Sequence, residues 1–305
     1  MTAQSSTDTT VRPSFSSNDL KMLFVMFIWG ANFAIVKSAL DVLPPLVFVA
    51  LRFGLGTIIL MAILLWREGW PQLSKQDWIK LIGLGIVGNT IYQPFFTFSL
   101  NYTTAANSSL ILASVPLFVA IVNAVMGIER INRSLAAGIG LAMLGMALVL
   151  AASGLSLGGE TLFGDFLCFI AMVAWSVYTI GLRSVGHLSN LQVSALTMLT
   201  GAPGLVLIGL PEMASLDWSQ VGVDAWGALL YSALFAICVA YLVWNNSVRV
   251  AGATRTAVYQ CLTPLIATAV AWYLLGEPFT LIQGIGGVLI IVGLLLSTLR
   301  GRNKV

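Results

Sequence analysis

Charged residues are scarce in this sequence. Asp, Glu, Lys and Arg together make up 9% of its 305 residues, whereas about 25% of an ordinary soluble domain is charged. Apolar residues make up 58%, and the mean hydropathy is +0.93. This composition excludes a soluble globular protein and predicts an integral membrane protein. The net charge of +3 is scattered between apolar runs, so no basic surface for a nucleic acid is expected.

Residues that bind metals or form disulfides are also few. Cys168, Cys238 and Cys261 each lie in an apolar segment, and His187 is the one histidine. Neither a disulfide framework nor a zinc site can be built from them. No glycine-rich run ends in the Lys-Ser/Thr of a phosphate loop, which argues against coupling to ATP hydrolysis. We therefore expect no metal and no cofactor.

The sequence does contain apolar runs of about 20 residues, which is the length of a membrane-spanning helix and not of a β-barrel strand. Ten spans are predicted, at residues 20–38, 44–66, 79–99, 105–127, 133–151, 164–182, 192–210, 225–247, 254–275 and 281–299. Residues 1–19, rich in Ser and Thr, are predicted to form a disordered tail without a signal peptide, and residues 300–305 a second tail. The expected fold class is an all-α membrane protein with ten transmembrane helices.

Positive charge is distributed unevenly between the two sets of loops. With ten spans both termini lie on one side, and that side holds thirteen cations: Arg12, Lys21, Arg67, Lys75, Lys80, Arg130, Arg133, Arg183, Arg249, Arg255, Arg300, Arg302 and Lys304. Lys37 is the one cation on the other side, and Arg52 lies within the second span. Because loops rich in Lys and Arg stay in the cytoplasm, we expect a multi-pass protein of a bacterial-type inner membrane with both termini cytoplasmic.

The two halves of the sequence resemble each other. At an offset of 148 residues, Pro116, Glu129, Gly138 and Gly145 match Pro264, Glu277, Gly286 and Gly293, and at an offset of 146 Trp29 matches Trp175. Each half, 20–152 and 160–299, holds five spans, so the second half is expected to cross the membrane in the opposite sense. Two inverted five-helix repeats are the usual construction of secondary transporters, because exchange of conformation between the halves opens a cavity first to one side and then to the other.

Several motifs carry a family resemblance. The pattern W-G-x-N-F occurs at 29–33, "ALRF" stands at 50–53, and two blocks, beginning "ASVPLFVAIVNAVMGIER" and "CLTPLIATAVAWYLLGEP", each contain Pro, then Glu near the helix end, then spaced Gly. This chain resembles the drug/metabolite transporter superfamily, specifically its ten-helix EamA branch, and within that branch it is most similar to the YddG type of aromatic amino acid exporter. The resemblance implies export or exchange of small metabolites.

Aromatic and amide residues near the middle of the spans form the candidate substrate site. Asn32 follows Trp29 by three residues and Tyr178 follows Trp175 by three, so each pair shares a helical face. An indole, an amide or a phenol needs a polar partner, which the bundle interior offers and lipid does not; alternatively, the two indoles only fill space between helices. The candidate substrate-binding residues are Trp29, Asn32, Phe33, Arg52, Tyr92, Gln93, Trp175, Tyr178, Tyr241, Asn245 and Gln260.

Arg52 is the one clearly embedded charge. Because a cation at that depth costs about 2.5 kcal/mol or more, it should face a cavity, where it either binds a substrate carboxylate or locks the packing by bonding backbone carbonyls. Trp244 shares a helical face with Tyr241 and Asn245, but it also lies five residues from Arg249, so it belongs either to the site or to an aromatic belt at the membrane surface. Tyr259, four residues past Arg255, is expected in such a belt.

Proline and glycine mark the fourth, fifth, ninth and tenth spans. Pro116 and Pro264 fall within predicted helices, where each is expected to kink the helix or to free a carbonyl, at Leu112 and Gln260, as a ligand. The glycines of the fifth and tenth spans allow close helix approach, as internal scaffold or as a dimer seam. The chain is accordingly expected to be a monomer or a homodimer.

These features favour a secondary transporter that exports small organic solutes, chiefly amino acids including aromatic ones, with the substrate and membrane lipids as its partners. A proton-coupled multidrug antiporter is the alternative, weakened because no Asp or Glu falls in the middle of a span. A membrane-embedded enzyme needs a nucleophile with a base, a metal cluster or paired carboxylates, and the sequence contains no such arrangement. A passive channel is the third alternative.

Overall fold

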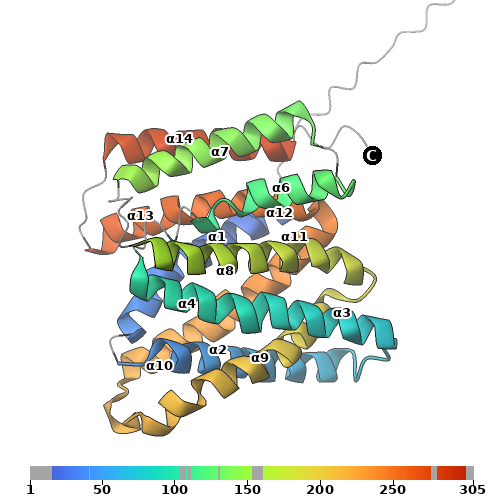
Figure 1. Cartoon of the computed structure of the whole chain (residues 1–305), viewed down its shortest axis with the longest axis vertical. Coiled ribbons are helices and arrows are strands. Elements are labelled where there is room, and N and C mark those ends of the chain that lie inside the picture. The colour runs from blue at the N-terminus through green and yellow to red at the C-terminus, as the bar shows by residue number, and fades with distance from the viewer. Residues whose placement is uncertain are drawn as a thin grey trace, which may run out of the picture.

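The computed structural model is a bundle of helices (Figure 1). It describes residues 16–40, 42–103, 108, 111–129, 131–152, 161–275 and 280–299, and this part of the chain contains no β-strand. In chain order the α-helices are α1 (Ser17–Leu40), α2 (Pro45–Arg67), α3 (Lys75–Gly85), α4 (Tyr92–Tyr102), α6 (Val115–Val125), α7 (Arg133–Ala152), α8 (Leu162–Gly181), α9 (Asn190–Ser215), α10 (Val223–Tyr231), α11 (Ala240–Ala251), α12 (Ala253–Val258), α13 (Leu262–Leu275) and α14 (Leu281–Leu299). Short π- or 3-10-helical segments are η1 (Ile86–Ile91), η3 (Leu182–Val185), η4 (Trp218–Gln220), η5 (Ser232–Val239) and η6 (Tyr259–Cys261).

The described helices agree with the apolar runs of the sequence. Five of them are long and apolar enough to cross a membrane, at Pro45–Arg67, Arg133–Ala152, Leu162–Val185, Asn190–Ser215 and Val223–Ala251, and shorter apolar helices occupy Val115–Val125 and Leu281–Ser297. The tail predicted at residues 1–19 overlaps the first helix, because α1 already begins at Ser17. Ser16 and Asp19 cap this helix reciprocally: the Ser16 amide donates to Asp19 (2.8 Å) and the Asp19 amide donates to the Ser16 hydroxyl (3.2 Å).

Two of the predicted spans are interrupted by π-helical turns. The run from α3 to α4 contains η1, and the run from α10 to α11 contains η5. A π turn breaks the regular backbone ladder and is often found at functional sites. The Ala236 carbonyl, within η5, accepts a hydrogen bond from the Trp29 indole (3.0 Å). Hydropathy alone predicts continuous helices here and contains no signal for this change of pitch.

The prolines of the fourth and ninth spans lie at breaks and not inside straight helices. Pro116 occupies the first turn of α6, directly after a turn at residues 113–114. Pro264 lies in the first turn of α13, just after η6. A proline is well tolerated at the start of a helix because the amide it lacks would have no intrahelical partner there. The expectation of a kink within a continuous helix is therefore corrected to a helix start.

Glycines allow α7 and α14 to lie side by side, as Figure 1 shows at the top of the view. A Cβ atom added at Gly138 would come within 2.7 Å of the Gly293 carbonyl oxygen, and one at Gly145 within 2.4 Å of the Gly286 carbonyl oxygen. Only glycine permits this approach of the two backbones. The predicted small-residue seam is thus used inside the chain.

At one end of the bundle, hydrogen bonds join the termini of neighbouring helices. They connect Asn18 of α1 to Ser247 of α11 (3.0 Å), Ser189 before α9 to Glu68 after α2 (2.7 Å), Lys80 of α3 to the Ser184 carbonyl of η3 (3.3 Å) and Asn123 of α6 to Thr254 of α12 (3.1 Å). The described cations near these helix ends are Lys21, Arg67, Lys75, Lys80, Arg133, Arg183, Arg249 and Arg255. We call this the basic end.

The opposite end is closed by apolar packing. Ala39, Leu43, Phe48 and Leu229 belong to a buried cluster that joins the end of α1, the start of α2 and α10. The main hydrophobic core fills the rest of the bundle.

Candidate functional site

Six aromatic side chains meet near the centre of the bundle, and we call them the aromatic cluster. Trp175 of α8 is its hub, with ring centroids at 5.2 Å from Tyr92, 5.3 Å from Tyr178, 5.5 Å from Trp244, 5.6 Å from Tyr241 and 6.0 Å from Trp29. These rings come from α1, α4, α8 and α11, so the site is assembled from both halves of the chain.

Local sequence explains how the rings are presented together. Trp175 and Tyr178 are three residues apart on α8, and Tyr241 and Trp244 are three apart on α11, so each pair projects from one helical face. Gly88 of η1 makes room for the α8 pair, because a Cβ atom there would lie 2.4 Å from Cδ2 of Tyr178. The cluster therefore depends on a glycine in a neighbouring helix as well as on its own residues.

A buried cation adjoins the aromatic cluster. Arg52 is 8% exposed, and its two terminal nitrogens donate to Gln93 Oε1 (2.8 Å) and Ser232 Oγ (3.2 Å). Its guanidinium lies over the ring of Phe53 (5.6 Å), and that ring is 6.3 Å from Tyr241. Arg52 thus bonds side chains and not the backbone carbonyls that the sequence analysis considered.

A chain of amides and hydroxyls lies toward the basic end. Tyr178 donates to Asn245 Oδ1 (3.0 Å), and Asn245 Nδ2 donates to Ser194 Oγ on α9 (2.9 Å). Tyr241 donates to Asn89 Oδ1 (3.4 Å), and Asn89 donates in turn to a backbone carbonyl of α9. These bonds tie α8, α9 and α11 together directly beside the rings.

Several buried N–H groups at this site have no hydrogen-bond partner in the part of the chain that the structure describes. They are the indole nitrogens of Trp175 and Trp244 and Nε of Arg52. Leaving a buried donor unpaired costs about 1–3 kcal/mol, so such groups call for a function. The matching indole of Trp29 is satisfied by Ala236. The site as a whole offers apolar ring faces together with free donors, which suits a ligand that has an apolar body and an anionic or carbonyl group.

Three acidic side chains contact residues at helix ends. Asp19 accepts from the Tyr259 hydroxyl (2.7 Å), and Glu129 lies against Gly252. Asp165 near the start of α8 bonds Thr103. Glu277, the matched partner of Glu129, lies outside the described residues.

Outside the spans, hydrogen bonds perturb two carboxyl groups. The Ser74 hydroxyl, and next to it the His187 imidazole, hold the pKa of Asp77 below its ordinary value. The Asp77–His187 distance is 3.1 Å, which ties the start of α3 to the loop between η3 and α9 at the basic end. The Ser219 hydroxyl and amide lower the pKa of Asp217 in the same way at the opposite end.

The structure brings most of the predicted site residues together. Trp29, Tyr92, Trp175, Tyr178 and Tyr241 belong to the aromatic cluster, and Arg52, Gln93 and Asn245 bond beside it. Asn32 and Gln260 are half-buried with side-chain oxygens that accept no hydrogen bond, and no described contact joins them to the cluster. The side chain of Phe33 lies outside the described residues.

The structure decides between belt and interior for two aromatic residues. Of the two alternatives for Trp244, the belt is wrong, because its ring is fully buried and lies 5.4 Å from that of Trp29. The belt assignment of Tyr259 is also wrong, since it is 2% exposed and bonds Asp19. The three-residue spacing from Tyr241 indicated the correct face for Trp244, whereas the distance in sequence from Arg249 pointed to the belt.

Sequence reasoning missed small polar side chains of the site. Asn89, Ser194 and Ser232 all bond members of the site. Ser194 and Ser232 are single small residues within apolar runs, which are as often packing residues as ligands. Nothing in the local sequence distinguishes the two roles.

An all-helical bundle with membrane-length apolar helices and a polar, aromatic centre is the architecture of a membrane-embedded transport protein. The sequence pattern of the EamA-like transporter family matches this chain twice, over residues 17–151 and 162–299. The chain belongs to the EamA-like transporter family, whose members are transporters and not enzymes.

Curated relatives agree with this assignment. The chain is 29% identical to the uncharacterized transporter YyaM of Bacillus subtilis (strain 168), over 88% of this chain and 89% of that protein. It is 30% identical to an uncharacterized transporter of Archaeoglobus fulgidus, over 93% and 98%. It is 28% identical to the "Probable amino-acid metabolite efflux pump" of Escherichia coli (strain K12), over 93% and 96%. A crystal structure with 20% sequence identity has the same fold, with a TM-score of 0.79 over 95% of this chain and 100% of that one.

Proposed function

We propose that this protein is a secondary transporter that exports small organic metabolites, chiefly amino acids including aromatic ones. The observation that carries the proposal is the set of unpartnered N–H groups of Trp175, Trp244 and Arg52 around buried aromatic rings. A substrate carboxylate can accept from these donors, and an apolar side chain can stack on the rings. The substrate ammonium group can lie over a ring face, a contact worth about 0.5–2 kcal/mol.

One comparison supports this substrate class. The relative from Escherichia coli carries the name of a probable amino-acid metabolite efflux pump. This is a similarity at the level of the family, so the substrate assignment rests mainly on the chemistry of the cluster.

We propose further that the two matched halves are inverted five-helix repeats, ten spans in all, that alternate access to the cluster. Contacts between the halves support this. Gly138 contacts Gly293, and Gly145 contacts Gly286. Gly286 and Gly293 are the positions that match Gly138 and Gly145 at the offset of 148 residues, so each contact is the counterpart of the other with the two halves exchanged. Likewise, η1 shifted by 148 residues coincides with the last six residues of η5. A two-fold relation between the halves gives this reciprocity.

The proposed orientation places the basic end, and both termini, in the cytoplasm of a bacterial-type inner membrane. The proposed driving force is the substrate gradient or exchange of one substrate for another. No described carboxylate bonds a member of the aromatic cluster, and Arg52 keeps its charge at physiological pH.

Counterflow tests the transport proposal. Purified protein is reconstituted into liposomes loaded with unlabelled phenylalanine, and trace labelled phenylalanine is added outside. A carrier gives transient accumulation of label above its external concentration, whereas a passive channel gives simple equilibration. Absence of any protein-dependent flux for phenylalanine, tryptophan and leucine would remove amino acids as the substrate class.

A pH gradient tests the driving force in the same liposomes. With no substrate gradient, an imposed pH difference is expected to produce no net uptake. Concentrative uptake that a protonophore abolishes would identify proton coupling and favour the antiporter alternative.

A further inference from the structure

At the basic end, one carboxylate joins the start of α1 to the break between α12 and α13. Asp19 Oδ1 accepts a hydrogen bond from the Tyr259 hydroxyl of η6 (2.7 Å), and Asp19 Oδ2 accepts from the amide and the hydroxyl of Ser16 (both 2.8 Å). Beside it, Asn18 donates to Ser247 of α11 (3.0 Å). Tyr259 is 2% exposed, so its ring lies inside the bundle and its hydroxyl meets a carboxylate of the other half of the chain.

The contact between α1 and α13 changes in character along its length. At Gly30 an added Cβ atom would lie 2.6 Å from Cγ2 of Ile266, so the two helices are closely packed there. Nearer the basic end, the Thr263 hydroxyl donates to the sulfur of Met26 (3.5 Å), which is a weak acceptor. Asp19 lies eleven residues before Gly30, or about 16 Å of helix. The contact is therefore fixed by packing at one point and by a charge-assisted hydrogen bond at its tip.

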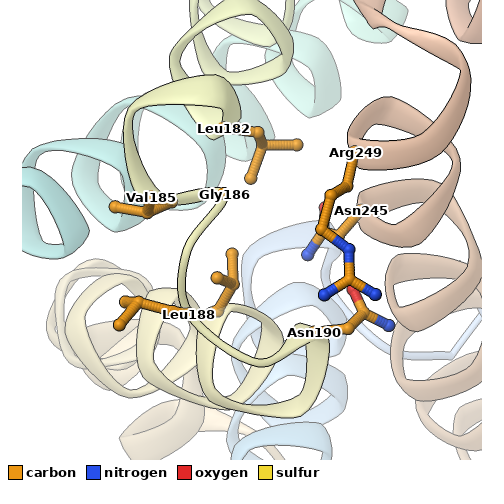
Figure 2. Close-up of a pocket in the computed structure, with 8 residues that line it drawn as sticks. Leu182, Val185, Gly186, Leu188, Asn190, Asn245 and Arg249 are labelled. Atoms are coloured by element: carbon orange, nitrogen blue, oxygen red, sulfur yellow. The ribbon is translucent and has the colours of Figure 1, made fainter.

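The basic end is also closed on the side of α9. The hollow between η3, α9 and α11 (Figure 2) has about 10 Å³ of space for water, which is room for about one molecule. Its apolar wall is at most 9% exposed and is formed by Leu182, Val185 and Leu188. A solute cannot pass here without a movement of the helices.

The second half of the chain has a carboxylate at the matched position. Asp165 follows Asp19 by 146 residues, the offset that also matches the two tryptophans, and it lies near the start of α8 at the opposite end. Asp165 Oδ1 accepts from Thr103 of the first half, and Asp165 Oδ2 accepts from Thr161 (3.1 Å). Each carboxylate thus bonds its own helix start with one oxygen and the other half of the chain with the second.

We propose that the Asp19–Tyr259 bond is a latch, which holds the basic end closed and breaks when the bundle opens there. Opening separates the start of α1 from η6 and the start of α13, while the contact of Gly30 with Ile266 stays as the pivot. Trp29, next to the pivot, then becomes accessible from the basic end. The inference rests on the proposed alternation of access and does not depend on which solute is carried.

A buried thiol between the latch and the pivot reports this opening. Met26→Cys, at a position that is 0% exposed, is placed in a chain whose three natural cysteines, all buried, are replaced by alanine. Tyr259→Phe removes the hydroxyl that bonds Asp19 and keeps the ring. A membrane-impermeant maleimide applied to the basic end should label Met26→Cys about tenfold faster in Tyr259→Phe, because a hydrogen bond to a charged group is lost. Applied to the opposite end, the same reagent should label it no faster than in the parent.

The matched contact at the opposite end supplies the controls. Thr103→Val removes the hydroxyl that bonds Asp165, and it should leave the labelling of Met26→Cys from the basic end unchanged. Met172→Cys, the matched reporter on α8 at a position that is 3% exposed, should label no faster in Tyr259→Phe. Labelling of Ser184→Cys, which is exposed at the basic end, identifies the membrane preparation in which that end faces the reagent.

The outcomes separate the latch from the transported substrate. Asp19→Ala removes the latch from the other helix and should reproduce Tyr259→Phe. If counterflow of phenylalanine is measured but neither variant speeds the labelling of Met26→Cys, the latch is wrong and transport stands. Equal acceleration in Thr103→Val, or faster labelling of Met172→Cys, would show general loosening and would also overturn the latch. If counterflow fails for every amino acid while the one-sided acceleration is observed, the latch stands and the proposed substrate class fails.

Discussion

At the scale of single residues, the matched tryptophans of the two halves are used differently. The Trp29 indole donates to the Ala236 carbonyl of η5, whereas the Trp175 indole has no partner among the described residues. The same side chain at equivalent positions is therefore structural in one half and available in the other. This difference can be measured, because phenylalanine removes the N–H group while keeping most of the ring.

Trp29→Phe and Trp175→Phe form a matched pair. Both variants lose part of the indole volume, and this loss lowers the free energy of unfolding of each. Trp29→Phe should be about 1 kcal/mol less stable than Trp175→Phe, because only in Trp29→Phe does the Ala236 carbonyl lose its donor. Counterflow of phenylalanine should nevertheless fall several-fold in Trp175→Phe. Thermal unfolding in detergent and counterflow are the measurements. Undiminished transport by Trp175→Phe would mean that this indole donates nothing to the substrate.

Arg52 can be tested by a change that preserves its charge. Arg52→Lys cannot bond Gln93 and Ser232 together and has no Nε–H. We expect folded protein and at least a tenfold loss of transport at low substrate concentration, since a hydrogen bond to a charged group contributes about 1.5–3 kcal/mol. Arg67→Lys, an exposed cation at the end of the same helix, is the control. A lower melting temperature with unchanged transport would assign Arg52 to packing alone.

At the scale of elements, close approach between helices is set by glycine. The run from α3 through η1 to α4 passes α8 and α9 so closely that Gly85 and Gly88 have no room for a side chain. The same run carries Tyr92 and Gln93 into the site. Spacing between these helices thus controls both stability and the geometry of the rings.

Gly88→Ala should disturb this contact and Gly83→Ala should not. An added Cβ at residue 88 meets the Tyr178 ring at 2.4 Å, while nothing lies within 4 Å of one at residue 83. We expect Gly88→Ala to cost about 1–3 kcal/mol through overpacking, with loss of transport. Gly83→Ala should be neutral or stabilising by up to about 1 kcal/mol because alanine favours the helix. Equal melting temperatures for the two variants would contradict the close packing.

The start of α3 carries a pH-dependent contact. The pKa of Asp77 is lowered first by the Ser74 hydroxyl and also by His187, so its carboxylate stabilises the folded state at pH values above about 3.9, the usual value for Asp. That stabilisation is lost as the pH falls through the lowered pKa of the folded protein. Asp77→Asn should melt below the parent at pH 7, and the difference should begin to shrink as the pH falls below about 3.9 and vanish only below the lowered pKa of the folded protein. A difference in melting temperature that does not shrink at all as the pH is lowered from 7 into this range would show that Asp77 acts otherwise.

At the scale of the whole molecule, the two ends differ in chemistry. The basic end gathers eight described cations, whereas the other end is closed by the apolar packing of α1, α2 and α10. Asn245, through its bonds to Tyr178 and Ser194, lies on the side of the aromatic cluster that faces the basic end. The proposed direction of transport therefore depends on which side of the membrane the basic end faces.

Orientation can be read from two single cysteines. Ser184→Cys lies at the basic end and Ser219→Cys in η4 at the opposite end, both exposed. In intact cells a membrane-impermeant maleimide should label Ser219→Cys and leave Ser184→Cys unlabelled until the membrane is opened. The reverse pattern would place the basic end outside and invert the direction proposed here.

Much of the architecture and most of the site composition follow from the sequence. Apolar runs of membrane length predicted the helices, and the placement of Lys and Arg predicted which helix ends lie together, because hydropathy and charge are local properties of the chain. Trp29, Trp175 and Tyr178 could be grouped because matched positions and three-residue spacing define a helical face.

Only the tertiary structure decided what depends on the rotation and pitch of packed helices. Trp244 enters the cluster because α11 turns that face inward beyond the π turn of η5, and no residue count from Arg249 contains this information. The unpaired indole of Trp175 and the bonds of Arg52 and Asn245 likewise arise between segments far apart in sequence. Composition determined that these helices belong in a membrane, whereas the close packing of their side chains determined which polar groups are left free to bind a solute.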